Sequence, residues 1–196
     1  MSFKIFLATK NPAKLREIKE ILKKFDCTVL LPDVADFPPE TGQTFQENAL
    51  IKASFVGRMY PQHYVAGEDS GLVVPALNGM PGVLSARFAG PDANDGKNIE
   101  KLLQYSKNLK DGEREAYFIC VIALIEPSGN HRFFEGRLYG RIVQEPSGSN
   151  GFGYDPIFEI PEYGKTVAQL SVEEKNKISH RAKAFLQLAE YLEMAV

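Results

Sequence analysis

Apolar positions near the N-terminus follow a strand pattern and then a helix pattern. Residues 3–9 (FKIFLAT) form a nearly continuous apolar run, which predicts a buried strand. From Pro12 to Lys24 apolar residues recur at helical spacing, namely Leu15, Ile18, Ile21 and Leu22. Asn11 is a favourable N-cap and Pro12 suits the first helical position, so a helix is expected to begin there.

Strands and helices continue to alternate along the next part of the chain. Residues 27–31 (CTVLL) predict a second strand, and residues 44–60 predict a second helix in which Thr44 and Glu47 have capping-box spacing. Residues 64–74 (YVAGEDSGLVV) are expected to form strand, turn and strand, because the central Asp, Ser and Gly favour a turn. A third helix is expected over residues 94–107.

Hairpin signals dominate later in the chain. Residues 114–126 and 131–143 predict an antiparallel pair across the turn PSGN, followed by a Gly- and Ser-rich loop, EPSGSNGFGYDP. The C-terminal region is helical and is expected to break near Ser179. This order favours an α/β protein with a mixed sheet, and no repeat or linker divides the 196 residues, so residues 1–196 are expected to form one domain.

Composition narrows the class of protein. Lys and Arg number 23 against 25 Asp and Glu, and the net charge of −2 argues against a general nucleic-acid-binding surface. Two cysteines make no disulfide framework, and no secretory signal or apolar run of membrane-spanning length is present. We therefore expect a soluble cytoplasmic protein without a nucleic-acid or membrane partner.

The segment TKNPAK lies where the first strand ends and the first helix begins. Free N–H groups and the helix dipole make such a position suitable for an anion. Thr9 and Asn11 offer hydrogen-bonding groups, and Lys14 adds a positive charge one turn into the helix. An ordinary N-cap followed by a surface lysine explains the same residues equally well.

Three carboxylates are candidates for metal binding or water activation. Glu68 and Asp69 follow a buried run and precede Ser70, and carboxylates at a strand end are well placed to hold Mg²⁺. Glu47 stands near a helix start, where it is also available to a metal. The structural alternatives are a hairpin turn for the first pair and a capping box for Glu47.

Two later segments carry further candidates. In NGFGYDP, Gly151 and Gly153 allow a ligand to approach the backbone, Phe152 offers a stacking face and Asp155 an acceptor. In EEKNKISHRAK, positive charge gathers before and within the last helix, at Lys175, Lys177, His180, Arg181 and Lys183. An irregular loop and a solvated helix face are the structural alternatives.

Read together, these segments resemble the inosine triphosphate pyrophosphatase family. The markers cover nearly the whole chain in the family's order: TKNPAK, FQENALIKA, EDSGL with GMPGVLSARFAG, GFGYDPIF and SHRAKA. The resemblance implies a twisted mixed β-sheet flanked by helices, with two lobes and a central active-site cleft. It also implies a homodimer that requires Mg²⁺ and cleaves inosine, deoxyinosine and xanthosine triphosphates into a nucleoside monophosphate and pyrophosphate.

The resemblance also implies roles for individual residues. Asp69 would be the general base, and Glu47 and Asp69 would serve the metal. Many relatives carry Asp where this chain has Glu68, which is a further candidate ligand. The residues expected to bind substrate are Thr9, Lys10, Asn11, Lys14, Ser70, Phe152, Gly153, Tyr154, Asp155, Lys175, His180 and Arg181. A pyrophosphatase for other modified nucleotides, and a sensor that binds nucleotide without turnover, remain alternatives.

Overall fold

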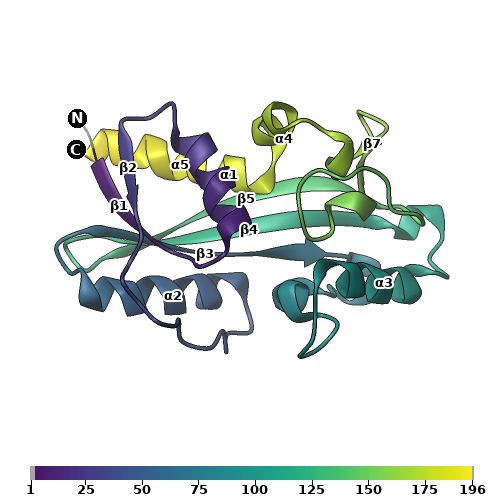
Figure 1. The fold of residues 1–196 in the computed structure, drawn as a ribbon, viewed down its shortest axis with the longest axis horizontal. Coiled ribbons are helices and arrows are strands. Elements are labelled where there is room, and N and C mark those ends of the chain that lie inside the picture. The colour runs from purple at the N-terminus through teal and green to yellow at the C-terminus, as the bar shows by residue number, and fades with distance from the viewer. Residues whose placement is uncertain (1–2, 196) are drawn as a thin grey trace. The chain divides into compact units, whose positions relative to one another are not determined.

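A mixed seven-stranded sheet with helices against it forms the framework of the protein (Figure 1). The computed structural model describes residues 3–195. The strand order is β2-β1-β3-β4-β5-β6-β7. The strands are β1 (Phe3–Ala8), β2 (Cys27–Leu30), β3 (Tyr64–Val73), β4 (Glu115–Ile125), β5 (His131–Ile142), β6 (Phe158–Ile160) and β7 (Lys165–Thr166). The α-helices are α1 (Pro12–Leu22), α2 (Phe45–Met59), α3 (Asp95–Ser106), α4 (Val172–Ile178) and α5 (His180–Ala195).

Strand directions confirm the mixed sheet predicted from the sequence. Strand β1 runs parallel to both β2 and β3, and the connections through α1 and α2 supply the crossovers that parallel strands require. Strand β6 runs antiparallel to β5 and to β7. The short strands β6 and β7, and five short 3₁₀ helices, have no counterpart in the sequence prediction: Pro75–Leu77, Gly82–Arg87, Asp111–Glu113, Asp155–Ile157 and Val167–Gln169.

The prediction of a turn within residues 64–74 is wrong, because β3 runs without interruption from Tyr64 to Val73. Turn-favouring residues lie in the interior of this strand, and all but Ser70 among residues 65–72 are buried. The surrounding core and the pairing of β3 with β1 outweigh the local turn preference of Asp and Gly. The two carboxylates of GEDSGL are therefore strand residues and not loop residues.

The chain divides into two compact units, residues 1–69, 120–136 and 180–196 in the first and residues 70–119 and 137–179 in the second. In the first unit, α1 and α5 cover one face of β1 and α2 covers the other (Figure 1). Alternation along β1 explains this, since Ile5 and Leu7 pack with α1 and α5, whereas Phe6 and Ala8 pack with α2. Residues 1, 2 and 196 of the predicted domain lie outside the described residues.

The second unit has its own apolar core. Side chains from α3, the end of β3, the start of β4, the later part of β5 and the loop before β6 meet there. Its largest members include Phe118 and Phe158, whose ring centroids are 4.5 Å apart. Helix α3 begins at the N-cap Asn94, whose side-chain oxygen accepts a hydrogen bond from the Lys97 backbone N–H.

Two glycines allow helices of the first unit to approach the sheet closely. A Cβ at Gly67 in β3 would lie 2.4 Å from the Ala49 carbonyl oxygen and 2.6 Å from the Ala53 nitrogen of α2. A Cβ at Gly136 in β5 would similarly meet the His180 carbonyl oxygen at the start of α5. Only glycine permits this packing, which brings α2 close to the face of β3 that Gly67 shares with Asp69.

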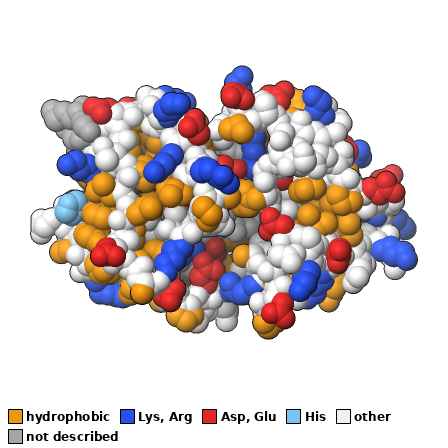
Figure 2. Space-filling model, in the orientation of Figure 1, with side chains coloured by type: hydrophobic (Ala, Val, Ile, Leu, Met, Phe, Trp, Pro, Cys, Tyr) orange, Lys and Arg blue, Asp and Glu red, His pale blue; other side chains and the backbone are white. Residues whose placement is uncertain are grey.

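Charged side chains of both signs are interspersed on the face of residues 3–195 shown in Figure 2. This distribution agrees with the nearly balanced charge of the sequence. Among the described residues, no helix has the length and apolar character needed to cross a membrane.

Candidate active site

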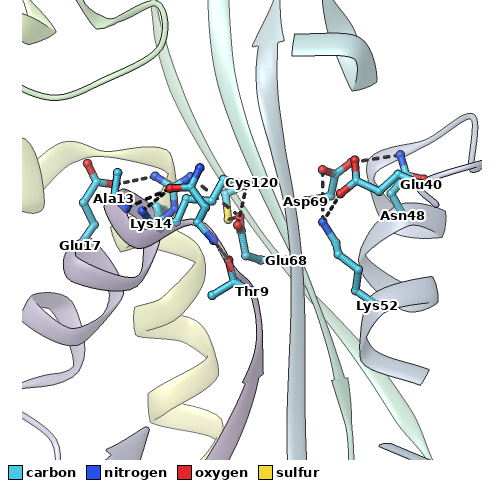
Figure 3. Close-up of polar contacts among 12 residues, drawn as sticks. Thr9, Ala13, Lys14, Glu17, Glu40, Asn48, Lys52, Glu68, Asp69 and Cys120 are labelled. Carbon is cyan, nitrogen blue, oxygen red and sulfur yellow. Dashed lines mark hydrogen bonds and ion pairs between the residues drawn. The ribbon is translucent and has the colours of Figure 1, made fainter. Parts of the chain in front are cut away.

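Glu68 and Asp69 are adjacent in sequence but lie on opposite faces of β3 (Figure 3). Successive side chains of a strand point in opposite directions, so each carboxylate meets a different set of partners. Ala66 packs with α1 and α5, which is the side that Glu68 shares, and Val65 packs with α2, which is the side that Asp69 shares. The structure thus does not bring Glu68 together with Asp69 as two ligands on one face.

The Asp69 carboxylate is held by side chains of α2. The Asn48 amide donates a hydrogen bond to Asp69 Oδ2 at 3.2 Å, and Lys52 Nζ lies 3.7 Å from Asp69 Oδ1. Asn48 and Lys52 are four residues apart, so they share one face of the helix. Lys52 Nζ also donates to Glu40 Oε1 at 2.5 Å, so two carboxylates converge on one ammonium group.

Burial raises the pKa of the Asp69 carboxylate. Only 5% of the residue is exposed, and this burial, together with the negative charges of Glu40 and Glu68, raises the pKa of Asp69 to about 6 despite the opposing charge of Lys52. A general base functions best when its pKa lies near the working pH. At neutral pH this carboxylate is mostly ionised and more basic than an ordinary aspartate.

Glu68 has the opposite environment although it is equally buried. Lys14 Nζ lies 2.6 Å from Glu68 Oε1, and Arg181 Nη2 lies 3.8 Å from Oε2. Burial disfavours its charge, but Lys14, Arg181 and Lys52 outweigh that effect and hold the pKa of Glu68 well below its usual range. Glu68 is therefore ionised at neutral pH as the partner of two cations, and Lys14 is paired and largely buried instead of exposed on the surface.

The start of α5 joins the same group of charges. Arg181 is almost fully buried, and its Nη1 donates to Glu17 Oε2 of α1 at 2.5 Å. Its guanidinium therefore links two acidic side chains, Glu17 and Glu68, within the first unit. His180 precedes it as the first residue of α5 and is also buried. The predicted break near Ser179 is confirmed, since Ser179 separates α4 from α5.

The TKNPAK segment forms the predicted helix cap. Asn11 Oδ1 accepts hydrogen bonds from the backbone N–H groups of Ala13 at 2.9 Å and Lys14 at 3.1 Å, and the Asn11 N–H donates to Thr9 Oγ1 at 3.2 Å. Lys10 points instead to the exposed Asp36 at 3.0 Å. The cap and the ionic partner of Lys14 are both present, so this segment is ordered before any ligand binds.

Glu47 closes the predicted capping box of α2. Glu47 Oε2 accepts from the backbone N–H groups of Gln43 at 2.6 Å and Thr44 at 3.1 Å, and Thr44 Oγ1 accepts from the Glu47 N–H. Glu47 also lines an open groove of about 820 Å³ with residues of the preceding loop and of the outward face of α2: Pro38, Thr41, Gly42, Gln43, Leu50, Ile51, Ser54 and Arg58.

In the second unit, the structure brings Phe152, Asp155 and Lys175 together. Lys175 Nζ lies 2.6 Å from Asp155 Oδ2, which also accepts from the Phe152 backbone N–H at 3.0 Å. The same ammonium lies 5.1 Å from the centroid of the Phe152 ring, a cation–π distance. Gly151 has φ +78°, and a Cβ there would lie 2.0 Å from Asp155 Oδ2, so only glycine fits beside this ion pair.

Two neighbouring loop residues have structural contacts. The Tyr154 hydroxyl is buried and donates to the Ser85 carbonyl oxygen at 2.9 Å, and burial, with the nearby charge of Asp95, raises the pKa of Tyr154 above its usual range. Gly153 donates its backbone N–H to Asp95 Oδ2 at 2.7 Å. Ser70, the remaining predicted substrate residue, is partly buried in β3.

Residues 5–191 match the model of the Ham1 family. The chain belongs to the Ham1 family. It is 46% identical over 197 residues, with 96% of this chain and 97% of the other covered, to a protein of Clostridium perfringens named dITP/XTP pyrophosphatase. A protein of Halalkalibacterium halodurans with the same name is 47% identical over 191 residues, with 95% of this chain and 97% of the other covered.

Solved Ham1 structures share the fold of this Ham1-family chain. The Staphylococcus aureus Ham1 protein is 42% identical with a TM-score of 0.86, covering 98% of this chain and all of the other. A HAM1 protein from Coxiella burnetii is 40% identical with a TM-score of 0.87, covering 98% of this chain and 99% of the other. These matches confirm the family resemblance and the fold class predicted from the motifs.

Sequence reasoning missed three residues in the group around Asp69, namely Glu40, Asn48 and Lys52. Asn48 and Lys52 belong to the segment FQENALIKA, and their i, i+4 spacing was a signal that both face one direction. Glu40 lies in the loop before α2, and nothing in its spacing indicates that it reaches Lys52.

The carboxylates on the α2 side fit a divalent cation in part. Among residues 3–195, no group of three or more His, Cys, Asp or Glu side chains forms a complete protein metal site. Mg²⁺, however, commonly takes one or two carboxylates and completes its shell with water and substrate phosphate. Glu40 and Asp69 both converge on the Lys52 ammonium, which shows that this position favours positive charge.

Proposed function

We propose that this Ham1-family protein is an enzyme that hydrolyses inosine, deoxyinosine and xanthosine triphosphates to the nucleoside monophosphate and pyrophosphate. The observation that supports this most directly is Asp69, a buried carboxylate with a pKa raised to about 6 and fixed by Asn48. Such a group can accept a proton from an attacking water at neutral pH. The names of the relatives supply the substrate class.

Phosphate recognition is proposed for the segment from Thr9 to Lys14 with its cap residue Asn11. A triphosphate carries about four negative charges, which require fixed cations as well as a metal. Lys14 is held in place by Glu68, so its ammonium, which has three donors, can contact a phosphate oxygen as well with little loss of side-chain entropy. Lys10 is the more exposed of the two lysines and is proposed to contact the distal end of the chain of phosphates.

The metal is proposed to be Mg²⁺, held by Asp69 and Glu47 with Glu40 as a third carboxylate nearby. Bound there, the ion would neutralise phosphate charge and orient the anhydride bond. Glu68 faces the other side of β3, so we propose that it orders Lys14 and Arg181 instead of binding the metal.

Recognition of the base is proposed for the group of Phe152, Asp155 and Lys175. The Phe152 ring offers a stacking surface, the Asp155 carboxylate an acceptor for a ring N–H, and the Lys175 ammonium a donor to the 6-oxo group. Arg181 is held by Glu17 and Glu68 in the first unit, so its contribution, like that of the neighbouring His180, is proposed to lie with the charges near Lys14.

Release of pyrophosphate from a panel of nucleoside triphosphates tests the proposed function. We expect rapid hydrolysis of inosine, deoxyinosine and xanthosine triphosphates and poor hydrolysis of adenosine triphosphate, whose 6-amino group meets a donor. A site built to hydrogen-bond one group rejects an analogue lacking it by up to about 10⁴-fold. Equal kcat/KM for adenosine and inosine triphosphates would overturn the proposed specificity, and binding without turnover would indicate a nucleotide sensor.

The two roles of Glu47 can be separated with Glu47→Gln. A metal ligand should show a raised Mg²⁺ requirement with little change in melting temperature, and this is the result we expect. Loss of a cap alone costs about 1 kcal/mol of stability and does not depend on metal. The measurement is a Mg²⁺ titration of activity beside a thermal melt. Glu174→Gln, which alters the corresponding capping box of α4, is the matched control.

We further propose a homodimer that acts in the cytoplasm. The homodimer rests on the motif resemblance, and the cytoplasmic location on the composition of the chain. Light scattering coupled to size-exclusion chromatography tests the first, and a monomeric mass at the enzyme's working concentration would rule it out.

A further inference from the structure

Several hydrogen bonds hold the loop of residues 150–156 within the second unit. The Phe152 N–H donates to Asp155 Oδ2, and the Tyr154 hydroxyl donates to the Ser85 carbonyl oxygen. Between them, the Gly153 N–H donates to Asp95 Oδ2 at 2.7 Å, across 58 residues of sequence. Asp95 is a side chain from outside the loop, at the start of α3, and it binds the loop's backbone at its centre.

We propose that Asp95 is a positioning residue for base recognition, a role that rests on the proposed function. By holding the Gly153 N–H, it fixes the backbone of the residue that follows Phe152. The Phe152 ring thereby keeps its place over the Lys175 ammonium that is paired with Asp155. In this role Asp95 acts through Gly153 and not by contacting the base.

Three features of the structure support this role over a purely helical one. Asn94, and not Asp95, caps α3, since the Asn94 side chain accepts from the Lys97 N–H. The Asp95 carboxylate instead accepts from the Gly153 N–H of the loop. Gly153 has φ +62° and no heavy atom within 4 Å of an added Cβ, so side-chain packing does not hold this residue. The bond to Asp95 is also charge-assisted, which makes it stronger than a neutral hydrogen bond.

Steady-state kinetics of Asp95→Ala, Asp95→Asn and the control Asp92→Ala test the role. Asp92 is an exposed carboxylate three residues earlier, and its loss changes the net charge equally. We expect Asp95→Ala to raise KM for deoxyinosine triphosphate about tenfold, the effect of one charge-assisted hydrogen bond, with kcat within about twofold. Asp95→Asn retains an acceptor oxygen and should recover part of the loss, and Asp92→Ala should leave KM unchanged.

Two further measurements separate positioning from helix stability. Inhibition by tripolyphosphate, which has no base, should be the same in wild type and Asp95→Ala. Helix-dipole loss alone would lower the melting temperature slightly in both Asp95 variants without moving KM, and that outcome would overturn the proposal.

Hydrogen exchange of the Gly153 amide in the absence of nucleotide makes the test independent of the enzymatic assignment. We expect faster exchange in Asp95→Ala than in wild type or Asp92→Ala. Unchanged exchange would refute the positioning role even if the enzyme were active. If exchange were faster in Asp95→Ala but the wild type released no pyrophosphate, the contact between Asp95 and the loop would be supported and the proposed function would be refuted.

Discussion

Asp69→Asn should remove nearly all hydrolytic activity and at the same time raise the melting temperature at neutral pH. Asparagine keeps the shape of the side chain and can still contact Asn48 and Lys52, but it cannot accept the proton of the attacking water. Loss of a general base commonly costs about 10²–10⁴-fold in rate. The two measurements are pyrophosphate release and a thermal melt of the same preparations.

The gain in stability follows from the raised pKa of Asp69. Burial raises the pKa from 3.8 to about 6, so the folded protein holds the charged form less well than the unfolded chain does. Ionisation of Asp69 therefore costs stability at every pH above about 6, by roughly 1–3 kcal/mol, and this cost disappears below the unfolded pKa. Asparagine removes it, so the difference in melting temperature should be present at pH 7.5 and absent near pH 3.5.

The pH dependence of wild-type activity should report the protonation of Asp69. We expect kcat/KM to fall on the acid side as Asp69 takes up a proton, with an apparent pKa at or below about 6, because a bound Mg²⁺ favours the ionised carboxylate. Activity of Asp69→Asn within a few-fold of wild type would show that another residue is the base. A destabilised variant at pH 7.5 would show instead that the carboxylate is a structural partner of Lys52.

Glu68→Gln should have the opposite effect on stability and lower the free energy of unfolding by about 3–5 kcal/mol. The substitution leaves Lys14 and the buried Arg181 without the carboxylate that both contact. Removing one partner of a buried ion pair leaves an uncompensated charge, which accounts for costs of this size. Urea unfolding at pH 7 measures the effect, and Glu20→Gln, a change in an exposed carboxylate of α1, is the control.

The pH dependence gives an independent check on the role of Glu68. Its pKa is depressed in the folded protein, mainly because Lys14 and Arg181 overcome the opposing effect of burial. Its contribution to stability is complete above the unfolded pKa of 4.5 and declines as the pH falls below it. The gap between wild type and Glu68→Gln should therefore narrow at pH 3. A gap that stays constant from pH 7 to pH 3 would contradict this account.

Local signals in the sequence were enough to predict most helices and strands. Helix ends are marked by local residues, and the structure confirms the predicted N-caps Asn11 and Thr44 and the predicted break at Ser179. Helix α1 nevertheless ends at Leu22, two residues before the predicted end at Lys24, where no sequence signal stops a helix sharply. The turn predicted within β3 failed because Asp and Gly report local preference, whereas pairing with β1 and burial decide the outcome.

Most residues of the candidate site could be predicted from the sequence, but the contacts among them could not. Motifs indicated Asp69, Glu68 and Lys14, yet the face on which each lies depends on whether residues 64–73 are one strand or two. Pairs such as Arg181 with Glu17 are 164 residues apart, and Glu40 reaches Lys52 only because the loop before α2 folds over that helix. Such contacts arise from tertiary structure and leave no periodic trace in the sequence.

The uninterrupted course of β3 also limits how this segment can vary in length. Insertion or deletion of a single residue between Tyr64 and Gly67 would rotate every later side chain of the strand to the other face. The Asp69 carboxylate, which now contacts Asn48 and Lys52, would then face Lys14 and Arg181. The Glu68 carboxylate would face α2. Either carboxylate can be substituted while the other keeps its partners, but the spacing that precedes them cannot change without exchanging the two roles.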